Sequence, residues 1–226
     1  MPEDNAARAG RKTENRPKPT RVRRKTKTTM ATRYNIPKLQ AAMARKGYRW
    51  LSDMPYHLNM VGIRRANAVP NSFDDAFTVS YNDGKTWRYA EWKCTTDPGL
   101  HWLKSPMNAK GTAILKPGQY LDCWQVGMHQ GQYRALVQRG PVTVIRDYDR
   151  DAVLDYNSGR EENGIFGINI HRANAGRESV QVDRWSAGCT VIANPASFAA
   201  LMALASEAVR MGRKAFSYTL LNEADV

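Results

Sequence analysis

The sequence predicts a mainly β protein with flanking helices, built as an antiparallel β sandwich or barrel. Short segments rich in β-branched and aromatic residues follow one another closely through the middle of the chain. Gly- and Pro-rich turns separate them, such as Asn82-Asp83-Gly84 and Lys116-Pro117-Gly118. The chain has 226 residues, 42% of them hydrophobic, which is enough for one sizeable domain or two small ones.

The first thirty residues are expected to be a disordered basic tail. Residues 1–30 hold ten Lys or Arg against three Asp or Glu, a net charge of +7 out of +13 for the whole chain. Almost nothing apolar is available for burial there, and Pro17 and Pro19 oppose a helix. Such a tail favours anionic partners (nucleic acid, wall polymers or acidic lipid headgroups), although it can equally serve only for solubility.

Residues 31–104 are predicted to form a helix followed by a β-hairpin region. Pro37 suits the first turn of a helix and Gly47 suits its end, which predicts a helix over residues 37–46. Its expected inner face consists of Leu39, Ala42 and Met43. Strands are predicted over residues 58–63, 76–81 and 86–92, and Asn82-Asp83-Gly84 joins the last two as a hairpin.

Residues 105–226 are predicted to carry the remaining strands, a second helix and the functional site. The expected strands cover residues 114–115, 119–120, 133–137, 142–145 and 165–170. A helix is predicted to begin at Asn194-Pro195 and to run to about Arg213. Its expected buried face consists of Phe198, Leu201, Met202, Ala205 and Val209.

A nucleophile, a base and a tight turn coincide around His171 and Cys189. A Cys thiol is a good nucleophile only as thiolate, so it needs a neighbouring base. His171 stands eighteen positions before Cys189, at the end of the apolar run over residues 165–170. Gly188 allows a substrate to approach the backbone closely, and the N–H groups of Gly188 and Cys189 are candidate donors to an oxyanion. None of the four histidines follows Cys189, which excludes a papain-like order of Cys before His.

These residues resemble the catalytic motif of the L,D-transpeptidase (YkuD-type) family, in which a strand ending in His precedes a Ser-His-Gly-Cys turn. The matching stretches are residues 167–171 and Ser186-Ala187-Gly188-Cys189. The resemblance implies that Cys189 attacks the carbonyl after the third residue of a peptidoglycan stem and that His171 takes its proton. It also implies that the backbone carbonyl of Arg172 orients the imidazole and that Ser186 fixes the turn.

The chain departs from the family pattern at two positions. Ala187 replaces the second His of the turn, and Val191 replaces a polar residue after the Cys. Both departures bear on the choice of acceptor and on substrate binding more than on the role of Cys189 as nucleophile. They leave transfer to an amine (cross-linking) and transfer to water (cleavage) both open, and we expect no metal or cofactor. Trp185 and His129 are the residues expected to face the substrate.

The place where the protein acts is predicted from the same resemblance. The first thirty residues lack the apolar core of a secretory signal, and no apolar run is long enough to span a bilayer. L,D-transpeptidases act at the bacterial cell wall, so we expect delivery by another route, with a phage or prophage origin favoured.

Two other functional classes stay open. The first is a zinc-dependent amidase or peptidase that draws on His101, His129, His171 and acids such as Asp122 or Asp147, although no two of these histidines have the close spacing of a preformed site. The second is a non-catalytic wall-binding or virion structural protein in which Cys189 is a core residue, as Cys94 and Cys123 are expected to be. That class predicts a slow Cys189 with a high pKa and binding that survives Cys189→Ala.

Overall fold

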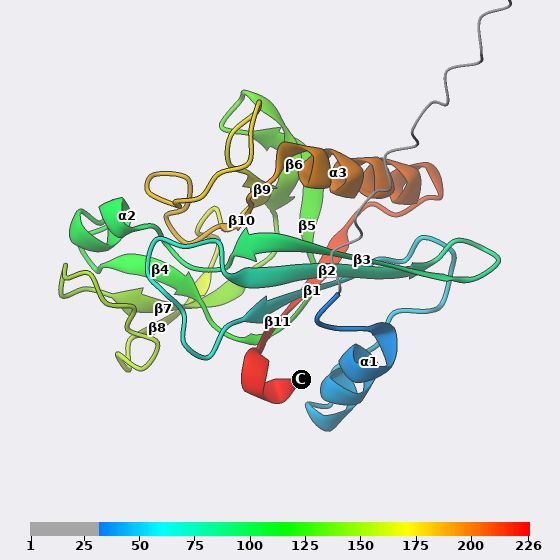
Figure 1. The fold of residues 1–226 in the computed structure, drawn as a ribbon, viewed down its shortest axis with the longest axis horizontal. Helices are drawn as coiled ribbons and strands as arrows, with labels where there is room; N and C mark the ends of the chain where they lie inside the picture. The colour runs from blue at the N-terminus through cyan, green and yellow to red at the C-terminus, as the bar shows by residue number, and fades with distance from the viewer. Residues whose placement is uncertain (1–31) are drawn as a thin grey trace, which may run out of the picture. The chain divides into compact units, whose positions relative to one another are not determined.

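Eight strands close into a barrel and three more form a small second sheet in the computed structural model, which describes residues 32–226 (Figure 1). The tail predicted over residues 1–30 lies outside the described residues. In barrel order the strands are β1 (Asn59–Arg64), β11 (Phe216–Asn222), β5 (Gly118–His129), β6 (Tyr133–Gln138), β9 (Ile170–Arg172), β10 (Thr190–Ile192), β3 (Trp87–Thr95) and β2 (Asp75–Asn82). The second sheet consists of β4 (Thr112–Leu115), β7 (Val142–Asp147) and β8 (Glu161–Gly164).

The expected mainly β class is confirmed, and most strand pairs are antiparallel as expected, with two parallel exceptions. β1 pairs with β11 in parallel, and so does β9 with β10. Parallel neighbours need a crossover connection. A long loop joins β9 to β10, whereas β1 and β11 come from the two ends of the described chain. Strands from both expected regions, residues 31–104 and 105–226, thus belong to one barrel within a single unit that spans Thr32–Val226.

The first helix, α1 (Ile36–Arg45), confirms the prediction from Pro37. The side chain of Asn35 caps it by accepting a hydrogen bond from the Lys38 N–H at 3.0 Å. Its inner face is the expected one and packs against β1 and β11. The buried residues of this contact include Leu39, Ala42, Met43, Val61, Ile63 and Leu221.

The last long helix, α3 (Pro195–Arg210), also forms as predicted and lies on the opposite side of the barrel from α1 (Figure 1). Asn194 caps it by accepting from the N–H groups of Ala196 and Ser197. Its buried positions are Phe198, Leu201, Ala205 and Ala208. The inclusion of Val209 in this face was wrong, because Val209 lies about one hundred degrees around the helix from Ala208 and is 43% exposed.

Two short helical segments were not predicted. The helix α2 (Leu100–Lys104) follows β3 after the Asp97-Pro98-Gly99 turn, and the 3-10 turn η1 (Glu223–Asp225) follows β11. No helix among residues 32–226 is long and apolar enough to cross a membrane.

The strand predicted over residues 165–170 does not form over most of its length. Gly167 has a φ of +77°, and Ile165 is 65% exposed. The Gln138 side chain takes over the hydrogen bonds that a neighbouring strand would supply, since its Oε1 accepts from the N–H groups of Phe166 and Ile168 at 3.0 and 2.9 Å. Only Ile170–Arg172 are paired as β9, so His171 lies in the middle of a short strand and not after a long one.

A buried ion pair joins β1 to the end of β3. The Arg64 guanidinium lies 2.9 Å from an Asp97 carboxylate oxygen and also donates to Thr96 and to the Leu115 carbonyl. Asp75 lies in the same cluster and accepts from the Thr96 N–H at 2.7 Å. All three charged side chains are almost fully buried. In such a cluster, removal of one charged side chain destabilises the fold, because its partner is left as an unpaired buried ion.

Candidate active site

The turn before Cys189 is held by Ser186. The Ser186 Oγ donates to the Cys189 carbonyl at 2.8 Å and accepts from the Gly188 N–H at 3.1 Å. Gly188 has a φ of +120°, and a Cβ there would overlap the carbonyl oxygen of Ala113 in β4. Only glycine therefore fits this position without moving Cys189 or β4.

The Gly188 N–H is consequently not free for an oxyanion, which corrects the expectation that both Gly188 and Cys189 would donate. The Cys189 N–H, by contrast, makes no hydrogen bond within residues 32–226. Of the two expected donors, the backbone N–H of the nucleophile is the one available to a developing negative charge.

The Cys189 thiol is partly exposed and rests as a neutral S–H group. It donates to the Gly167 carbonyl at 3.3 Å, and its sulfur accepts from the Asn169 N–H at 3.4 Å. Loss of solvation raises the pKa of Cys189 to about 11, against the opposing effect of the Asn169 N–H, which stabilises a thiolate. The thiol thus needs a base at the moment of attack.

His171 is held in one tautomer by the backbone of the next residue. Its Nδ1 lies 2.8 Å from the Arg172 carbonyl oxygen, which can only accept, so Nδ1 carries the proton and Nε2 does not. The Tyr133 hydroxyl donates to the same carbonyl at 3.1 Å and lies 3.3 Å from Nδ1. Burial lowers the pKa of His171 to about 3, with the neighbouring His129 as the second cause. The imidazole is therefore a neutral base at ordinary pH.

His129, from the end of β5, packs face to face with His171. Their ring centroids are 4.1 Å apart and their planes differ by 20°. The Asn169 amide nitrogen lies 3.1 Å from the His129 Nδ1, and the Asn169 Oδ1 accepts from the Gln138 N–H. The amide therefore donates to Nδ1, which leaves the His129 proton on Nε2. His129 thus supports the base as well as facing the pocket.

One pocket of about 620 Å³ gathers the residues that the sequence singled out. Cys189, His171, His129 and Trp185 all line it, and Trp185 is 41% exposed. Arg172 contributes its carbonyl, while its guanidinium packs over the Tyr133 ring at 4.1 Å. One pocket thus brings together a thiol, two imidazoles and an indole ring.

Two positively charged side chains also line this pocket. The Arg146 guanidinium pairs with Glu162 at 2.9 Å, whereas no acidic partner lies within ion-pair distance of Arg184 in the described residues. The pocket therefore offers Arg184 to an anionic ligand.

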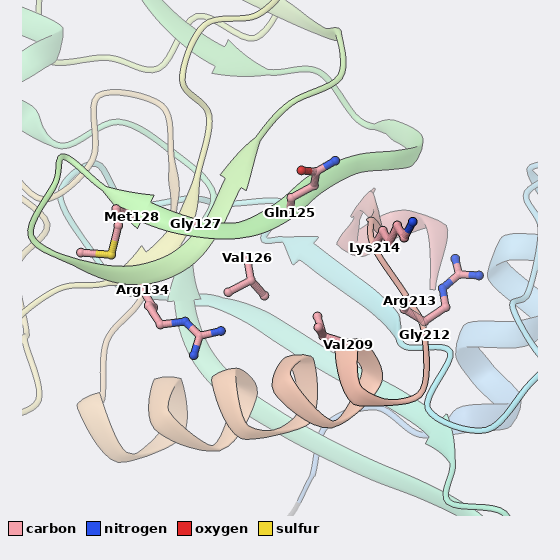
Figure 2. Close-up of a pocket in the computed structure, with 9 residues that line it drawn as sticks. All are labelled: Gln125, Val126, Gly127, Met128, Arg134, Val209, Gly212, Arg213 and Lys214. Atoms are coloured by element: carbon pink, nitrogen blue, oxygen red, sulfur yellow. The ribbon is translucent and has the colours of Figure 1, made fainter.

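A second pocket, of about 700 Å³, lies away from Cys189, between β5, β6 and the end of α3 (Figure 2). Arg134, Arg213 and Lys214 line it, together with the exposed Val209. It contains no nucleophile or histidine, and Arg213 is already paired with Asp122 at 3.2 Å. The cysteine and the histidines that the sequence singled out line the other pocket.

Of the residues of the zinc alternative, His129 and His171 stack on one another, but no third ligand joins them in a cluster within the described residues. Within residues 32–226, the one cluster of three or more side chains suited to a metal is Asp147, Asp149 and Asp155, with no histidine in it. His101 instead packs edge-on against Trp102.

Sequence reasoning missed Tyr133, Asn169 and Gln138. Tyr133 and Gln138 reach the site through long-range pairing, in particular through β6 beside β9, where Leu136 faces Ile170. A signal existed for Asn169, since it is the only polar residue in the apolar run over residues 165–170. No local pattern marks Tyr133 or Gln138.

Comparison of the chain with protein-family models, with curated proteins and with solved structures found no match. The described residues form a β barrel in which Cys189 and His171 line one pocket.

Proposed function

We propose that this protein is a peptidoglycan-active cysteine acyl-transfer enzyme with a barrel of the L,D-transpeptidase type. The observation that carries the proposal is that Cys189 and His171 line one pocket while a fixed tautomer leaves the His171 Nε2 without a proton. A neutral imidazole of this kind is suited to general-base catalysis.

In the proposed reaction, the Cys189 sulfur attacks the carbonyl carbon after the third stem residue as its proton passes to the His171 Nε2. The Cys189 N–H donates to the oxygen that becomes negative. The tetrahedral intermediate collapses, the C–N bond breaks, and the leaving amine takes the proton from His171. A thioester remains on Cys189.

The second half of the reaction regenerates the thiol. His171 removes a proton from an incoming amine or water, which attacks the thioester and displaces the Cys189 sulfur, and the departing sulfur takes that proton from His171 to become a thiol again. An amine gives a cross-link, and water gives cleavage. The two outcomes share every residue named above and differ only in which acceptor reaches the thioester.

The walls of the pocket suit a stem peptide. A stem peptide carries carboxylates, for which Arg184, unpaired among residues 32–226, is a partner, and Trp185 presents a partly exposed apolar face beside it. The substrate implies action at the bacterial cell wall, and we retain phage delivery as part of the proposal.

The test is a product analysis with tetrapeptide-stem muropeptides. We expect wild-type protein to release the fourth residue and to yield either a cross-linked dimer or a tripeptide stem, and Cys189→Ala and His171→Gln to be inactive. Cys123→Ala is the matched control, because Cys123 is a buried cysteine outside the pocket. Turnover that survives Cys189→Ala would contradict the proposal.

A specific observation also favours the non-catalytic alternative. The thiol points at the Gly167 carbonyl, and its pKa is raised to about 11, as expected for a cysteine that is only structural. In that case the protein binds wall material or a virion component, and Cys189→Ala leaves binding to purified peptidoglycan unchanged while no product forms. Product formation by the wild type alone separates the two functions.

A further inference from the structure

The loop after β7 carries acidic residues at a regular spacing. Asp147, Asp149, Asp151 and Asp155 occupy positions 1, 3, 5 and 9 of the segment that begins at Asp147. In the Ca²⁺-binding loop of EF-hands, the same positions supply oxygen ligands, and position 7 supplies a backbone carbonyl. Here position 7 is Val153. The pattern is the first observation that points to a cation.

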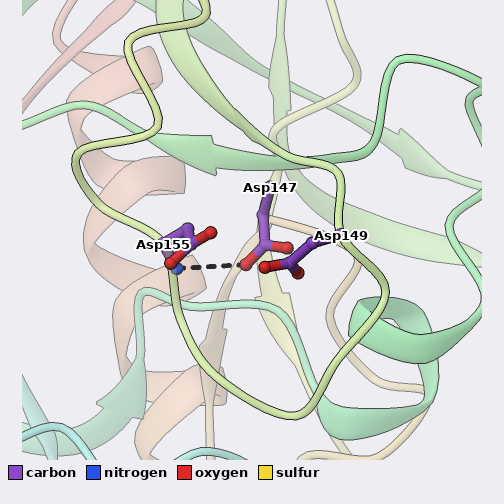
Figure 3. Close-up of side chains that lie close together, drawn as sticks. All are labelled: Asp147, Asp149 and Asp155. Carbon is purple, nitrogen blue, oxygen red and sulfur yellow. Dashed lines mark hydrogen bonds between the residues drawn. The ribbon is translucent and has the colours of Figure 1, made fainter.

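The structure brings three of these carboxylates together. Oxygen atoms of Asp147, Asp149 and Asp155 all lie within 4.8 Å of one another, and Figure 3 shows the three side chains pointing toward a common centre. Oxygens bound to one Ca²⁺ at about 2.4 Å lie at most about 4.8 Å apart, so the spacing of these three carboxylates is compatible with a single ion after a small adjustment of the side chains. For Mg²⁺, at about 2.1 Å, the limit is about 4.2 Å.

Asp147 supplies an independent observation. It is only 1% exposed, and its Oδ1 is buried without a hydrogen-bond partner among the described residues. Its other oxygen accepts from the Asp155 N–H at 3.1 Å, the bond drawn in Figure 3. A buried carboxylate oxygen without a donor is costly unless a proton or a cation satisfies it.

We propose that the loop of residues 147–155 binds a Ca²⁺ ion through the carboxylates of Asp147, Asp149 and Asp155, with Asp151 and the Val153 carbonyl completing the set. The ion satisfies the buried Asp147 oxygen and relieves the repulsion among the acids. The loop departs from EF-hands at position 6, which is Ala152 and not Gly.

Position 12 of the loop is Ser158 in place of the bidentate Glu. With fewer anionic ligands, binding is weaker than in intracellular sensors, and we expect a Kd on the order of 10⁻⁴ M.

The site has a structural consequence for the pocket. Asp147 ends β7 directly after Arg146, which lines the pocket with Cys189, and it pairs with Thr112 of β4, another lining residue. Bound Ca²⁺ therefore holds in place the loop of residues 147–155, which begins next to these two pocket-lining residues. The proposal does not depend on the acyl-transfer reaction, because binding is measured without turnover.

The test uses the full chain after dialysis against EDTA. Calorimetric titration with CaCl₂ is expected to show one site, and 10 mM CaCl₂, about a hundred times the Kd, is expected to raise the Tm by about 5–10 °C. Tb³⁺ should bind in place of Ca²⁺ and gain luminescence by energy transfer from Tyr148, the second residue of the loop. Cys189→Ala should bind as the wild type does, so failure of catalysis cannot be mistaken for failure of binding.

Two variants keep the test decisive. Asp147→Asn is expected to abolish the Ca²⁺ response, and the exposed Asp149→Asn, which leaves the buried position intact, is expected to weaken binding at least tenfold. Asp83→Asn, in the β2–β3 turn, is the matched control and should change nothing. The proposal is overturned if neither heat nor a Tm shift accompanies CaCl₂, or if Asp147→Asn stabilises the protein equally with and without Ca²⁺, since Asp147 would then be a protonated carboxyl.

Discussion

The rings of His129 and His171 stack with their centroids 4.1 Å apart, and both residues line the pocket that Cys189 also lines. Two buried imidazoles this close cannot readily carry positive charge together. Burial lowers the pKa of both rings, that of His171 to about 3. The stack therefore keeps the proposed base neutral and ready to accept a proton.

The pH profile follows from this arrangement. Because His171 is the base only when neutral and its pKa is about 3, we expect kcat/KM to stay level from pH 7 down to about pH 4. His129→Ala admits water and removes the neighbouring ring, so the acidic limb should move upward toward the ordinary value of about 6.5. His57→Ala, a buried histidine outside the pocket, is the control. If kcat/KM of the wild type already falls with an apparent pKa near 6.5, this account is contradicted.

The reactivity of Cys189 toward iodoacetamide should be low in the free protein. With a pKa of about 11, the thiolate fraction at pH 8 is roughly two hundredfold below that of an ordinary cysteine with a pKa of about 8.5. We expect alkylation to be slower by about that factor than in urea-unfolded protein and to accelerate toward pH 11. Mass mapping of the Cys189 peptide measures this rate, and rapid labelling at pH 7 would show a low pKa instead.

Tyr133 is expected to position the base without touching the substrate carbonyl. Its hydroxyl donates to the Arg172 carbonyl that orients His171, and a neutral hydrogen bond contributes about 0.5–1.5 kcal/mol. Tyr133→Phe should lower kcat about two- to tenfold, with KM little changed and Tm within a few degrees of the wild type. An unchanged kcat would show that Tyr133 does not position His171.

Gly188→Ala should abolish activity and destabilise the fold. The φ of +120° strains any other residue, at a cost of about 1–3 kcal/mol, and the added Cβ also overlaps the Ala113 carbonyl. Gly84→Ala is the matched control, because Gly84 has a φ of +92° with open space around its Cβ position. Denaturant unfolding separates the two effects, and equal losses in both variants would show that the contact with Ala113 is unimportant.

Arg64→Met tests the buried cluster. Removal of the guanidinium leaves Asp97 buried and unpaired, which is expected to cost about 3–5 kcal/mol of unfolding free energy. Arg88→Met, which breaks the exposed pair with Asp83, should leave stability nearly unchanged. Chemical denaturation of both variants checks the contrast, and similar stability would mean that Arg64 is not essential to the cluster.

Much of the fold was predictable because local signals agree with the final structure. Pro37 and Asn194-Pro195 mark helix starts, and Asn82-Asp83-Gly84 marks the β2–β3 hairpin. The strand β11 and its parallel pairing with β1 were not predictable, since they depend on contacts between the two ends of the described chain. The strand predicted over residues 165–170 was wrong because a side chain, Gln138, outcompetes strand pairing there.

The proposed nucleophile and base could be predicted from the sequence, but the residues that hold the proposed base in place could not. Cys189, His171 and Ser186 lie within one stretch whose spacing can be read directly. Tyr133 and the stacking of His129 on His171 arise from β5, β6 and β9 lying side by side in the barrel, which no local pattern encodes.

The most direct measurement of the central proposal is the mass of the protein after a brief incubation with a tetrapeptide-stem muropeptide and an acid quench. The account predicts an added acyl group equal to the stem without its fourth residue, located on the peptide that contains Cys189, removed by hydroxylamine and absent from Cys189→Ala. If the folded, reduced wild type forms neither this adduct nor a product, or if the adduct persists in Cys189→Ala, the account is contradicted.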